Sequence, residues 1–472
     1  MLFNSPEYFL FFLIVLTASW VLVGLPKLRI WVLLLASYYF YASNNGWLTI
    51  LIVFSTQFDF IAALKIAASR DPVVRKTWLT CSMIANLGLL GFFKYANFLG
   101  ESATEVAGFF GMQLGWFELN VLLPVGISFY TFEAMSYVID VYRRDIKPER
   151  KWHRFAFFIV YFPQLIAGPI VRAGQFLPQL DARPRLDVAT FEWSITRIFR
   201  GLFKKIVLAD TLALIVDAAY ADPSDVSASM ALIALYAFTL QIYFDFSGYT
   251  DIAIGCARLM GFQLPENFRN PYASTSITDF WRRWHLSLST WLRDYLYFPL
   301  GGSRMKTRLG VCRNLIITMT LAGLWHGAAW HFVFWGVLNG MLLAFERLTG
   351  IAKWAEENAN QSLVKRVIIS FIVFNFLTLL WVPFRAPSID VAYEILLRCF
   401  SDHSLESLTN GALITMVVVL LGWGIQVFSA STDGRDIVTI PLLGRAVIYG
   451  SLTLLIILFN AGELSPFIYF RF

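Results

Sequence analysis

The stretch LAGLWHGAAWHF, residues 321–332, lies in the middle of an apolar run that extends from 311 to 347. It holds two of the five histidines of the chain, His326 and His331, and it places a glycine three residues before and one residue after the first of them. The run is almost twice the roughly 20 residues that one membrane-spanning helix needs. It therefore predicts a hairpin or a re-entrant pair of helices, with glycines that permit close backbone approach or a broken helix beside His326.

The composition of the whole chain points to the same environment. Of its 472 residues, 57% are hydrophobic and only 15% are charged, whereas soluble domains carry about 25% charged residues. This indicates a membrane protein that crosses the bilayer many times. In a membrane protein the net charge of +6 indicates basic cytoplasmic loops and does not indicate a nucleic-acid partner. The four cysteines form no CxxC pair, so neither a disulfide framework nor a zinc site is indicated.

Apolar segments long enough to cross a bilayer recur along the chain. Clear candidates are 8–25, 30–43, 47–66, 78–99, 121–142, 229–247, 365–385, 409–430 and 445–461, and less regular ones are 155–171, 206–220, 248–262 and 311–347. We expect about eleven crossings with additional re-entrant pieces, in an all-α polytopic membrane protein. We expect a single membrane domain over 1–472, with N-terminal spans in 1–150, a core in 151–350, and C-terminal spans with an aromatic tail in 351–472.

The distribution of Lys and Arg between loops predicts the orientation. The loops at 65–76 and 143–154 are rich in these residues, whereas the intervening loop at 100–120 is poor in them. Basic loops remain in the cytoplasm, so the N-terminus and the C-terminus are both expected on the outer side. The sequence contains no visible internal repeat, which argues against a transporter built from inverted halves.

Two basic stretches, 172–205 and 263–313, are too polar to cross the bilayer and are predicted to form cytoplasmic helices that lie in the interface. Plotted as one helix, 278–302 gathers its apolar residues on one face, with Leu286 as the exception and His285 at the edge of that face. The face consists of Trp281, Trp284, Leu288, Trp291, Leu292 and Tyr295. Arg283 and Asp294 lie on the polar remainder. Attraction to anionic headgroups explains most of these charges, and an interfacial histidine that reaches water explains His285.

Acidic side chains occur within the apolar stretch LQIYFDFSGYTDIAIG, residues 240–255. A carboxylate at membrane depth costs about 2.5 kcal/mol or more unless it is paired or faces water. Asp245 and Asp251 are therefore predicted either to form ion pairs with the arginines of 282–293 or to line a polar tunnel.

The two histidines of the opening stretch are five residues apart, which separates them by roughly 140° on a helix. They cannot share a metal ion there, and no metal-ligand spacing occurs elsewhere, so no metal site is predicted. Histidine is the side chain best suited to move a proton near neutral pH. A neutral, hydrogen-bonded histidine in the protein core is an equally good interpretation of His326 and His331.

Four stretches together resemble the membrane-bound O-acyltransferase family, and within it the bacterial alginate O-acetylase branch. They are FWRRWHLSLSTWLRDYLYFPLGG, LAGLWHGAAWHFVFWG, QIYFDFSGYTDIAIG and the terminal PFIYFRF. The resemblance covers nearly the whole chain. It implies about eleven spans around a central tunnel, a catalytic histidine in the W-H-G element, which is His326, and a second one in the W-H-x-S element, which is His285.

The resemblance also implies the reaction. It indicates transfer of acetyl groups from a cytoplasmic donor, acetyl-CoA, with no cofactor bound by the protein. The basic stretches 172–205 and 263–313 would hold the donor phosphates, and His326 would act as general base, with His285 orienting the acyl group or relaying a proton. Supporting roles are assigned to Asp245, Asp251, Arg283, Asp294 and Tyr469.

In this branch a separate periplasmic acetyltransferase or esterase-like partner modifies the polysaccharide, within a secretion complex at the bacterial inner membrane. The tail resembles the F-x-Y-x-x-F ending of the branch, which makes the hydroxyl of Tyr469 a candidate acetyl carrier, with an aromatic membrane anchor as the alternative. Alginate is the expected polymer, while cellulose and peptidoglycan stay open. Rival functions are a transporter and a non-catalytic scaffold of the secretion complex.

Overall fold

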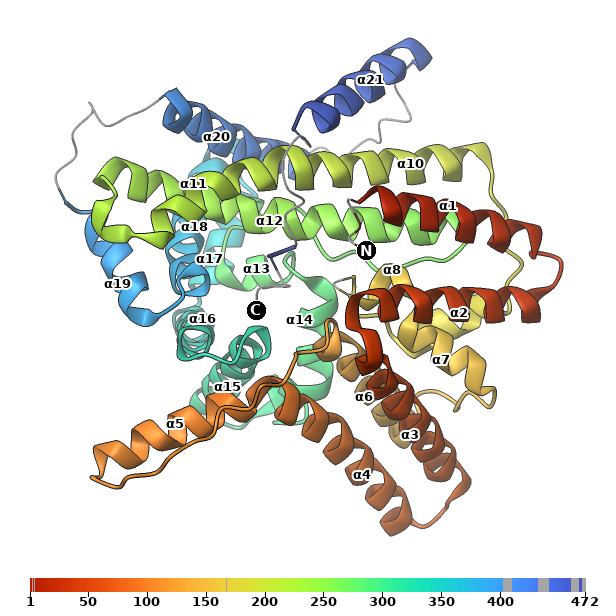
Figure 1. Cartoon of the computed structure of the whole chain (residues 1–472). Helices are drawn as coiled ribbons and strands as arrows, with labels where there is room; N and C mark the ends of the chain where they lie inside the picture. Colours follow the sequence, from red (N-terminus) through yellow and green to blue (C-terminus); the bar gives the residue numbers. More distant parts are fainter. Residues whose placement is uncertain are drawn as a thin grey trace. The chain divides into compact units, whose positions relative to one another are not determined.

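The computed structural model describes residues 1, 3, 5–166, 168–401, 410–431, 441–459 and 467–468 (Figure 1). Regular secondary structure in this part of the chain consists of helices and helical turns, without a strand. This confirms the predicted all-α class. Contacts divide the chain into two compact units, which are described separately: unit 1 comprises Met1–Ile195 and Ala253–Pro265, and unit 2 comprises Thr196–Ile252 and Glu266–Phe472.

Several helices of unit 1 begin with proline in the first turn, where the missing N–H would have no partner within the helix. The helices are α1 (Pro6–Val21), α2 (Pro26–Asn45), α3 (Thr49–Ala68), α4 (Pro72–Leu90), α5 (Ala96–Phe109), α6 (Ile127–Arg143), α7 (Trp152–Val160), α8 (Phe162–Leu165) and α9 (Ala173–Phe176), with the helical turns η1 (Gly46–Leu48), η2 (Gly91–Tyr95) and η3 (Leu177–Leu180). The helix α10 (Val188–Leu202) runs from unit 1 into unit 2.

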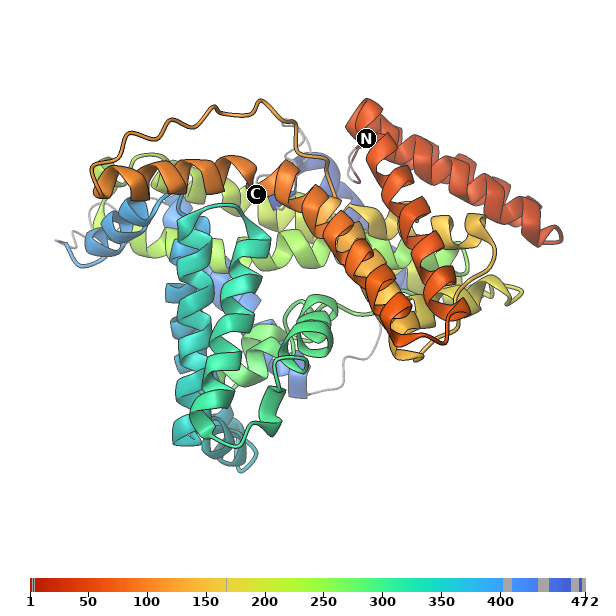
Figure 2. The same cartoon turned by 90° about the horizontal axis from the view of Figure 1, so that it is seen from below.

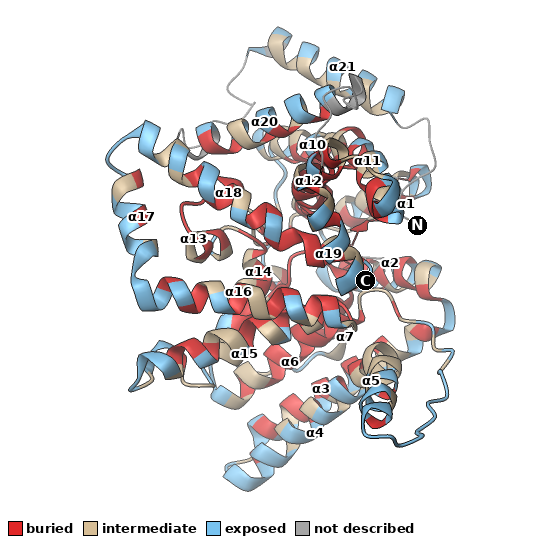
Figure 3. Ribbon diagram, turned by 90° about the vertical axis from the view of Figure 1, so that its left-hand side faces the viewer, coloured by how far each residue is buried: buried red, intermediate tan, exposed pale blue. Residues whose placement is uncertain are grey.

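The core of unit 1 lies along α6 and α7. Every residue from Phe155 to Phe162 is fully buried, and α6 buries most of its residues between Ile127 and Val138. Figure 3 shows α6 and α7 mainly as buried residues, whereas α4 and α5 carry many exposed ones. The exposed residues of α4 and α5 include large apolar side chains, which are the surfaces that a bilayer would cover.

Unit 2 contains the remaining elements. They are η4 (Phe203–Ala209), α11 (Asp210–Ala221), η5 (Pro223–Asp225), α12 (Ala228–Leu259), η6 (Pro271–Ala273), α13 (Ile277–Trp281), α14 (Leu286–Leu292), η7 (Arg293–Tyr297), η8 (Gly302–Arg304), α15 (Arg308–His326), α16 (Trp330–Thr349), α17 (Ile351–Ala359), α18 (Leu363–Arg385), α19 (Ile389–Arg398), α20 (Asn410–Ser431) and α21 (Leu442–Phe459). The last residues of α12 belong to unit 1.

Five helical runs within the described residues are long and apolar enough to cross a membrane: Pro26–Ala68, Pro72–Phe109, Ala228–Leu259, Trp330–Thr349 and Leu363–Arg385. Three shorter apolar helices accompany them: Pro6–Val21, Leu413–Phe428 and Leu443–Phe459. These helices identify a multi-pass membrane protein. The count of about eleven crossings stays a prediction.

The helix α12 differs from the sequence-based prediction. The segments 229–247 and 248–262 were expected as separate elements, but they form one continuous helix of 32 residues. Gly248, at the expected break, does not interrupt it. Its Cα lies against the backbone of η4 and α10, where an added Cβ would come within 2.8 Å of the Gly201 carbonyl oxygen. The glycine is therefore needed for close helix contact and not for a turn.

The apolar run 311–347 forms the predicted hairpin. The helices α15 and α16 are antiparallel neighbours joined by a short turn, visible as two adjacent teal helices in Figure 2. Glycines bring the two backbones together: a Cβ would lie 2.2 Å from the Phe332 carbonyl oxygen at Gly323, and 2.3 Å from the Met319 carbonyl oxygen at Gly336. Gly340, four residues after Gly336, would similarly meet the Cα of Ile316 at 2.7 Å.

We predict that Gly336→Ala destabilises the protein in detergent. The added methyl group meets backbone, which cannot rotate away, and such overpacking costs about 1–3 kcal/mol. The melting temperature of the purified protein should fall clearly. The control is Gly88→Ala on α4, where a Cβ meets no atom within 4 Å. Equal melting temperatures for the two variants would contradict the close α15–α16 contact.

Candidate active site

His326 is the last residue of α15 and lies in a buried aromatic environment. Its side chain is 4% exposed. The imidazole packs against the rings of Trp335 and Phe384, with 5.3 Å and 5.1 Å between the ring centroids. Both rings are nearly perpendicular to it. The next residue, Gly327, is extended and ends the helix. A Cβ on it would lie 2.1 Å from the ring of Phe332, so the glycine of the W-H-G element allows the Phe332 ring to pack there.

His285 is completely buried, which overturns its interpretation as an interfacial histidine that reaches water. The predicted continuous helix over 278–302 is also wrong. The chain forms two short helices, α13 and α14, and His285 stands at the start of the second with a left-handed backbone, φ +43°. This conformation is rare for residues other than glycine and interrupts the helical path.

The interruption at His285 is held by an asparagine from a preceding loop. The carbonyl oxygen of Asn267 accepts a hydrogen bond from the N–H of Leu286 at 3.0 Å. The side-chain oxygen of Asn267 accepts from the N–H of Ser287 at 3.3 Å and from its hydroxyl at 2.6 Å. Asn267 thus satisfies N–H groups that the first turn of α14 cannot pair by itself.

The ring of one tryptophan, Trp325, packs near the rings of both histidines. Trp325 lies 5.0 Å from the ring of His326 and 6.1 Å from the ring of His285, measured between centroids. The His285 ring also packs nearly perpendicular to the ring of Phe246, at 4.7 Å between centroids. Burial lowers the pKa of His285 to about 3, so its imidazole is neutral near pH 7. The structure therefore brings both predicted catalytic histidines into one aromatic site within unit 2.

His331 lies on α16, beyond the turn that follows His326. Its Nδ1–H donates a hydrogen bond to the carbonyl oxygen of Pro383 at 2.9 Å. That oxygen is available because residue 387, four positions further on, is a proline and has no N–H to donate. His331 is thus a hydrogen-bonded core residue by this contact, as the alternative interpretation predicted.

A cavity of about 370 Å³ begins at the residue directly after His326. Its lining includes Gly327, His331 and Gln241, together with Ile468 near the C-terminus. Arg385, also in the lining, pairs with Asp217 at 2.6 Å. The volume is at the lower end of the range for small-molecule sites, and polar groups line part of its wall.

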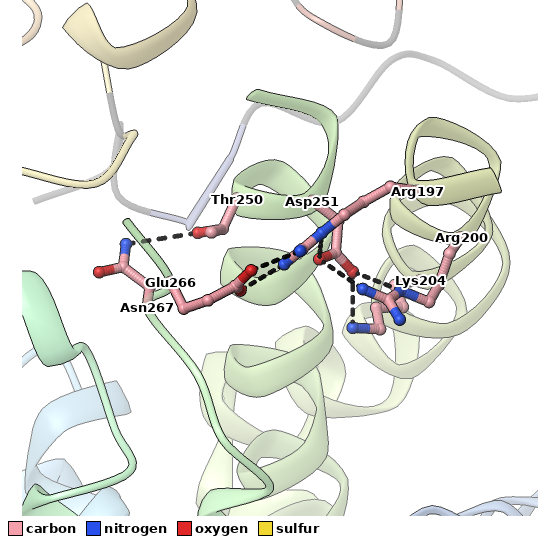
Figure 4. Close-up of polar contacts among 7 residues, drawn as sticks. All are labelled: Arg197, Arg200, Lys204, Thr250, Asp251, Glu266 and Asn267. Atoms are coloured by element: carbon pink, nitrogen blue, oxygen red, sulfur yellow. Dashed lines mark hydrogen bonds and ion pairs between the residues drawn. The ribbon is translucent and has the colours of Figure 1, made fainter. Parts of the chain in front are cut away.

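The acidic residues of α12 form ion pairs, but not with the predicted partners. Asp251 is 3% exposed and binds Arg197 at 2.9 Å, Arg200 at 3.0 Å and Lys204 at 2.9 Å (Figure 4). Arg197 extends on to the carboxylate of Glu266. The predicted pairing with arginines of 282–293 is therefore wrong. The partners lie on α10 and η4, which approach α12 closely at Gly201.

Asp245, one and a half turns before Asp251, has a different set of partners. It accepts hydrogen bonds from Lys205 Nζ at 2.6 Å and from the backbone N–H of Ile468 at 2.9 Å. The ring of Phe467 packs under the Lys205 ammonium group at 4.9 Å. Two residues of the C-terminal tail are thereby fixed to α12. Tyr469 itself lies outside the described residues.

The other two predicted supporting residues form local contacts. Arg283 pairs with Asp279 at 2.8 Å, one turn earlier, and Asp294 pairs with its neighbour Arg293 at 2.8 Å. Both pairs are partly exposed. Both pairs lie on the polar parts of the 278–302 segment.

Comparison with known proteins decides the family. The model of the membrane-bound O-acyltransferase family matches residues 151–383. A protein of Azotobacter vinelandii described as a probable alginate O-acetylase is 38% identical over 99% of this chain and 99% of its own length. A protein of Pseudomonas aeruginosa with the same description is 41% identical over 91% of this chain and 82% of its own.

The chain belongs to the membrane-bound O-acyltransferase family. It is an acyltransferase embedded in a membrane. A more distant relative is the peptidoglycan O-acetyltransferase of Helicobacter pylori, 35% identical over 84% of this chain and 79% of its own. The matched family region contains both histidines, the α10–α12 ion pairs and the α15–α16 hairpin.

Several residues of this acyltransferase site were not anticipated from the sequence. Trp325, Trp335 and Phe384 surround His326, although the last lies 58 positions away in α18. Asn267 supports the turn at His285. The W-H-G element could have pointed to Trp325, which directly precedes His326. Nothing in the local pattern points to Phe384 or Asn267, because their roles depend on contacts between distant segments.

We predict that Asp251→Asn strongly destabilises the acyltransferase. The substitution leaves the guanidinium of Arg197 and its neighbours without their shared carboxylate, and breaking a buried pair costs about 3–5 kcal/mol. The yield of folded protein and its melting temperature should both fall. The control is Glu357→Gln, which removes an exposed pair with Lys353 and should change stability by about 1 kcal/mol or less. Similar losses in both variants would refute the prediction.

Proposed function

We propose that this acyltransferase passes acetyl groups from cytoplasmic acetyl-CoA, through the bacterial inner membrane, to a periplasmic partner that O-acetylates an exported polysaccharide. The observation that carries the proposal is the pair of buried histidines joined by Trp325, beside a cavity that begins directly after His326. Relatives described as alginate O-acetylases, similar over nearly the full length, support alginate as the polymer.

The chemical step is attack of an acceptor hydroxyl on the acetyl thioester. His326 removes the hydroxyl proton while the oxygen bonds to the acetyl carbonyl carbon. The carbon–sulfur bond then breaks, and the proton passes to the departing thiolate. General-base assistance of this kind contributes about 10²–10⁴ in rate. His285, neutral and in contact with Trp325, orients the acyl group or relays the proton.

The donor phosphates require cations that are not already paired. Much of the charge of 172–205 is taken up by Asp251 and Asp245, through Arg197, Arg200, Lys204 and Lys205. In 263–313, by contrast, Arg282, Arg304 and Lys306 form no salt bridge with a described residue. The second stretch is therefore the better candidate for the donor phosphates, on the face that the loop charges assign to the cytoplasm.

The cavity beside His326 is the proposed acceptor side. The loop charges predict that the α15–α16 turn and the start of α19 face the periplasm, together with both termini. The cavity would receive a hydroxyl-bearing group of the partner or of the chain's own tail. CoA cannot cross the bilayer, so only the acetyl group would pass. Polysaccharide secretion proteins are the expected neighbours in the membrane.

Peptidoglycan acetylation is the second candidate. It is supported by the Helicobacter pylori relative, which is described as a peptidoglycan O-acetyltransferase. The membrane step would be the same, because it depends on the donor and the histidines and not on the polymer. Analysis of ester-linked acetate in exported polysaccharide and in purified cell wall would separate the two.

We predict that His326→Ala lowers acetyl transfer by about 10²–10⁴ while the protein still accumulates in the membrane. The measurement is transfer of radiolabel from acetyl-CoA to exported polymer in a deletion strain that carries the variant. His153→Ala is the control, since this histidine stacks on Trp31 in unit 1. Normal transfer by His326→Ala would support a scaffold. Its loss would argue against one.

We predict that Tyr469→Phe abolishes polymer acetylation but leaves acetyl-CoA binding intact. The support is the F-x-Y-x-x-F pattern and the position of the preceding residue, Ile468, in the cavity lining. The variant keeps the aromatic ring and loses only the hydroxyl. Tyr393→Phe, at an exposed tyrosine of α19, makes the same chemical change and should be harmless. Wild-type acetylation by Tyr469→Phe would leave the tail as an anchor or a docking segment.

A further inference from the structure

Unit 1 contains a second, larger cavity that takes no part in the proposed transfer step. Its volume is about 1290 Å³, and it lies at the ends of α3, α4, α6, α7 and α9. Two charged loops, 69–71 and 144–151, contribute to its rim. Its lining is strongly basic, with six cationic side chains against two acidic ones, and the cations are Arg70, Arg75, Arg144, Lys147, Arg150 and Arg154.

Both acidic side chains of the cavity are bound by a single arginine. Arg154 is 9% exposed and forms a two-point pair with Asp181, at 2.6 and 2.8 Å. Its Nε binds the carboxylate of Glu149 at 2.9 Å. Arg154 therefore offsets part of the negative charge of both carboxylates. Arg154, Glu149 and Asp181 form a framework of ion pairs in the cavity wall.

The other cations of the cavity are not paired with a carboxylate of a described residue. Arg75 is buried, donates a hydrogen bond to the carbonyl oxygen of Tyr142 and packs on the ring of the same residue at 5.4 Å. Arg70, Arg144, Lys147 and Arg150 are exposed at the rim, and none forms a salt bridge with a residue that the structure describes.

The framework holds this basic rim in place. Glu149 Oε1 accepts hydrogen bonds from the N–H groups of Arg150 and Lys151, both at 2.9 Å. The N–H of Glu149 itself donates to the hydroxyl of Tyr137 on α6 at 3.0 Å. The loop that carries Lys147 and Arg150 is thus tied to both α6 and α7. Cations gathered around one hollow repel one another, and an anion between them would relieve that repulsion.

We propose that this cavity binds a phosphate-bearing anion. Guanidinium groups match the oxygens of phosphate in two-point hydrogen bonds, and an ammonium group adds a further charge. The volume exceeds that of a single phosphate and admits a nucleotide bisphosphate or a phospholipid headgroup. The phosphate can thus come from either a soluble nucleotide or a lipid. The site belongs to unit 1, contains neither histidine, and does not depend on acetyl transfer.

The experiment compares two triple variants of the full chain, purified in neutral detergent. The cavity variant is Arg70→Gln, Lys147→Gln and Arg150→Gln. The control is Lys65→Gln, Lys76→Gln and Lys151→Gln, which removes the same charge from exposed positions of the same region that do not line the cavity. The probes are adenosine 3′,5′-bisphosphate, measured by thermophoresis, and phosphatidylglycerol, measured by native mass spectrometry against phosphatidylcholine.

The cavity variant should bind one of these probes about tenfold more weakly than wild type, or weaker still, and the control should bind it as wild type does. A selective loss of bisphosphate binding identifies a soluble phosphate ligand, and a selective loss of phosphatidylglycerol binding identifies a headgroup. Adenosine without phosphate should not bind. Equal binding of both probes by the two variants, or no binding by wild type, overturns the proposal.

Single substitutions protect the test against misfolding. If the triple cavity variant melts below wild type, Lys147→Gln and Arg150→Gln are measured separately, since both side chains are exposed and neither forms a salt bridge with a described residue. Each should weaken binding by a part of the triple effect. Neither result depends on acetyl transfer, so an inactive acyltransferase with an intact phosphate site would refute only the proposed function.

Discussion

The contact between the backbones of α15 and α16 is the constraint on which the candidate site depends. Gly323 and Gly336 place Cα atoms against carbonyl oxygens of the opposite helix, where no larger residue fits. In a bilayer, close packing of this kind replaces the hydrophobic effect as the force that joins helices, because lipid is as apolar as the side chains. The first helix of the hairpin, α15, ends at His326. The same contact that joins the helices therefore determines where the histidine lies and brings Trp335 of α16 against its ring.

The buried charges of α12 follow a related principle. A carboxylate such as Asp251 cannot remain unpaired at membrane depth, and α10 and η4 supply three cations only because Gly201 and Gly248 let the backbones meet. The cost of burying these charges is offset by an extended set of contacts and not by one pair. Cations used in this way are no longer available for a phosphate, which separates the paired cations from those that form no salt bridge with a described residue.

Residues near one another in sequence allowed good predictions, whereas contacts between distant segments did not. The apolar run 311–347 predicted the α15–α16 hairpin, because length and hydrophobicity determine whether a segment can cross once or twice. The acidic residues of 240–255 predicted ion pairing, but the expected partners, the arginines of 282–293, were wrong. The partners lie in the other basic stretch, 172–205, because packing between distant segments decides which cations reach α12. The helical pattern of 278–302 was misleading, since its apolar residues face protein and the path is broken at His285, where Asn267 competes for the N–H groups.

Both histidines of the site lie at helix ends, and this has a physical reason. A helix that stops inside a membrane protein exposes N–H or C=O groups, which is tolerated only where protein or a cavity surrounds them. At His285 the groups are satisfied by Asn267, and after His326 the chain is extended beside a cavity. Both imidazoles are packed among aromatic rings of unit 2. The helix ends that carry them are therefore surrounded by protein, which keeps the unpaired backbone groups away from lipid.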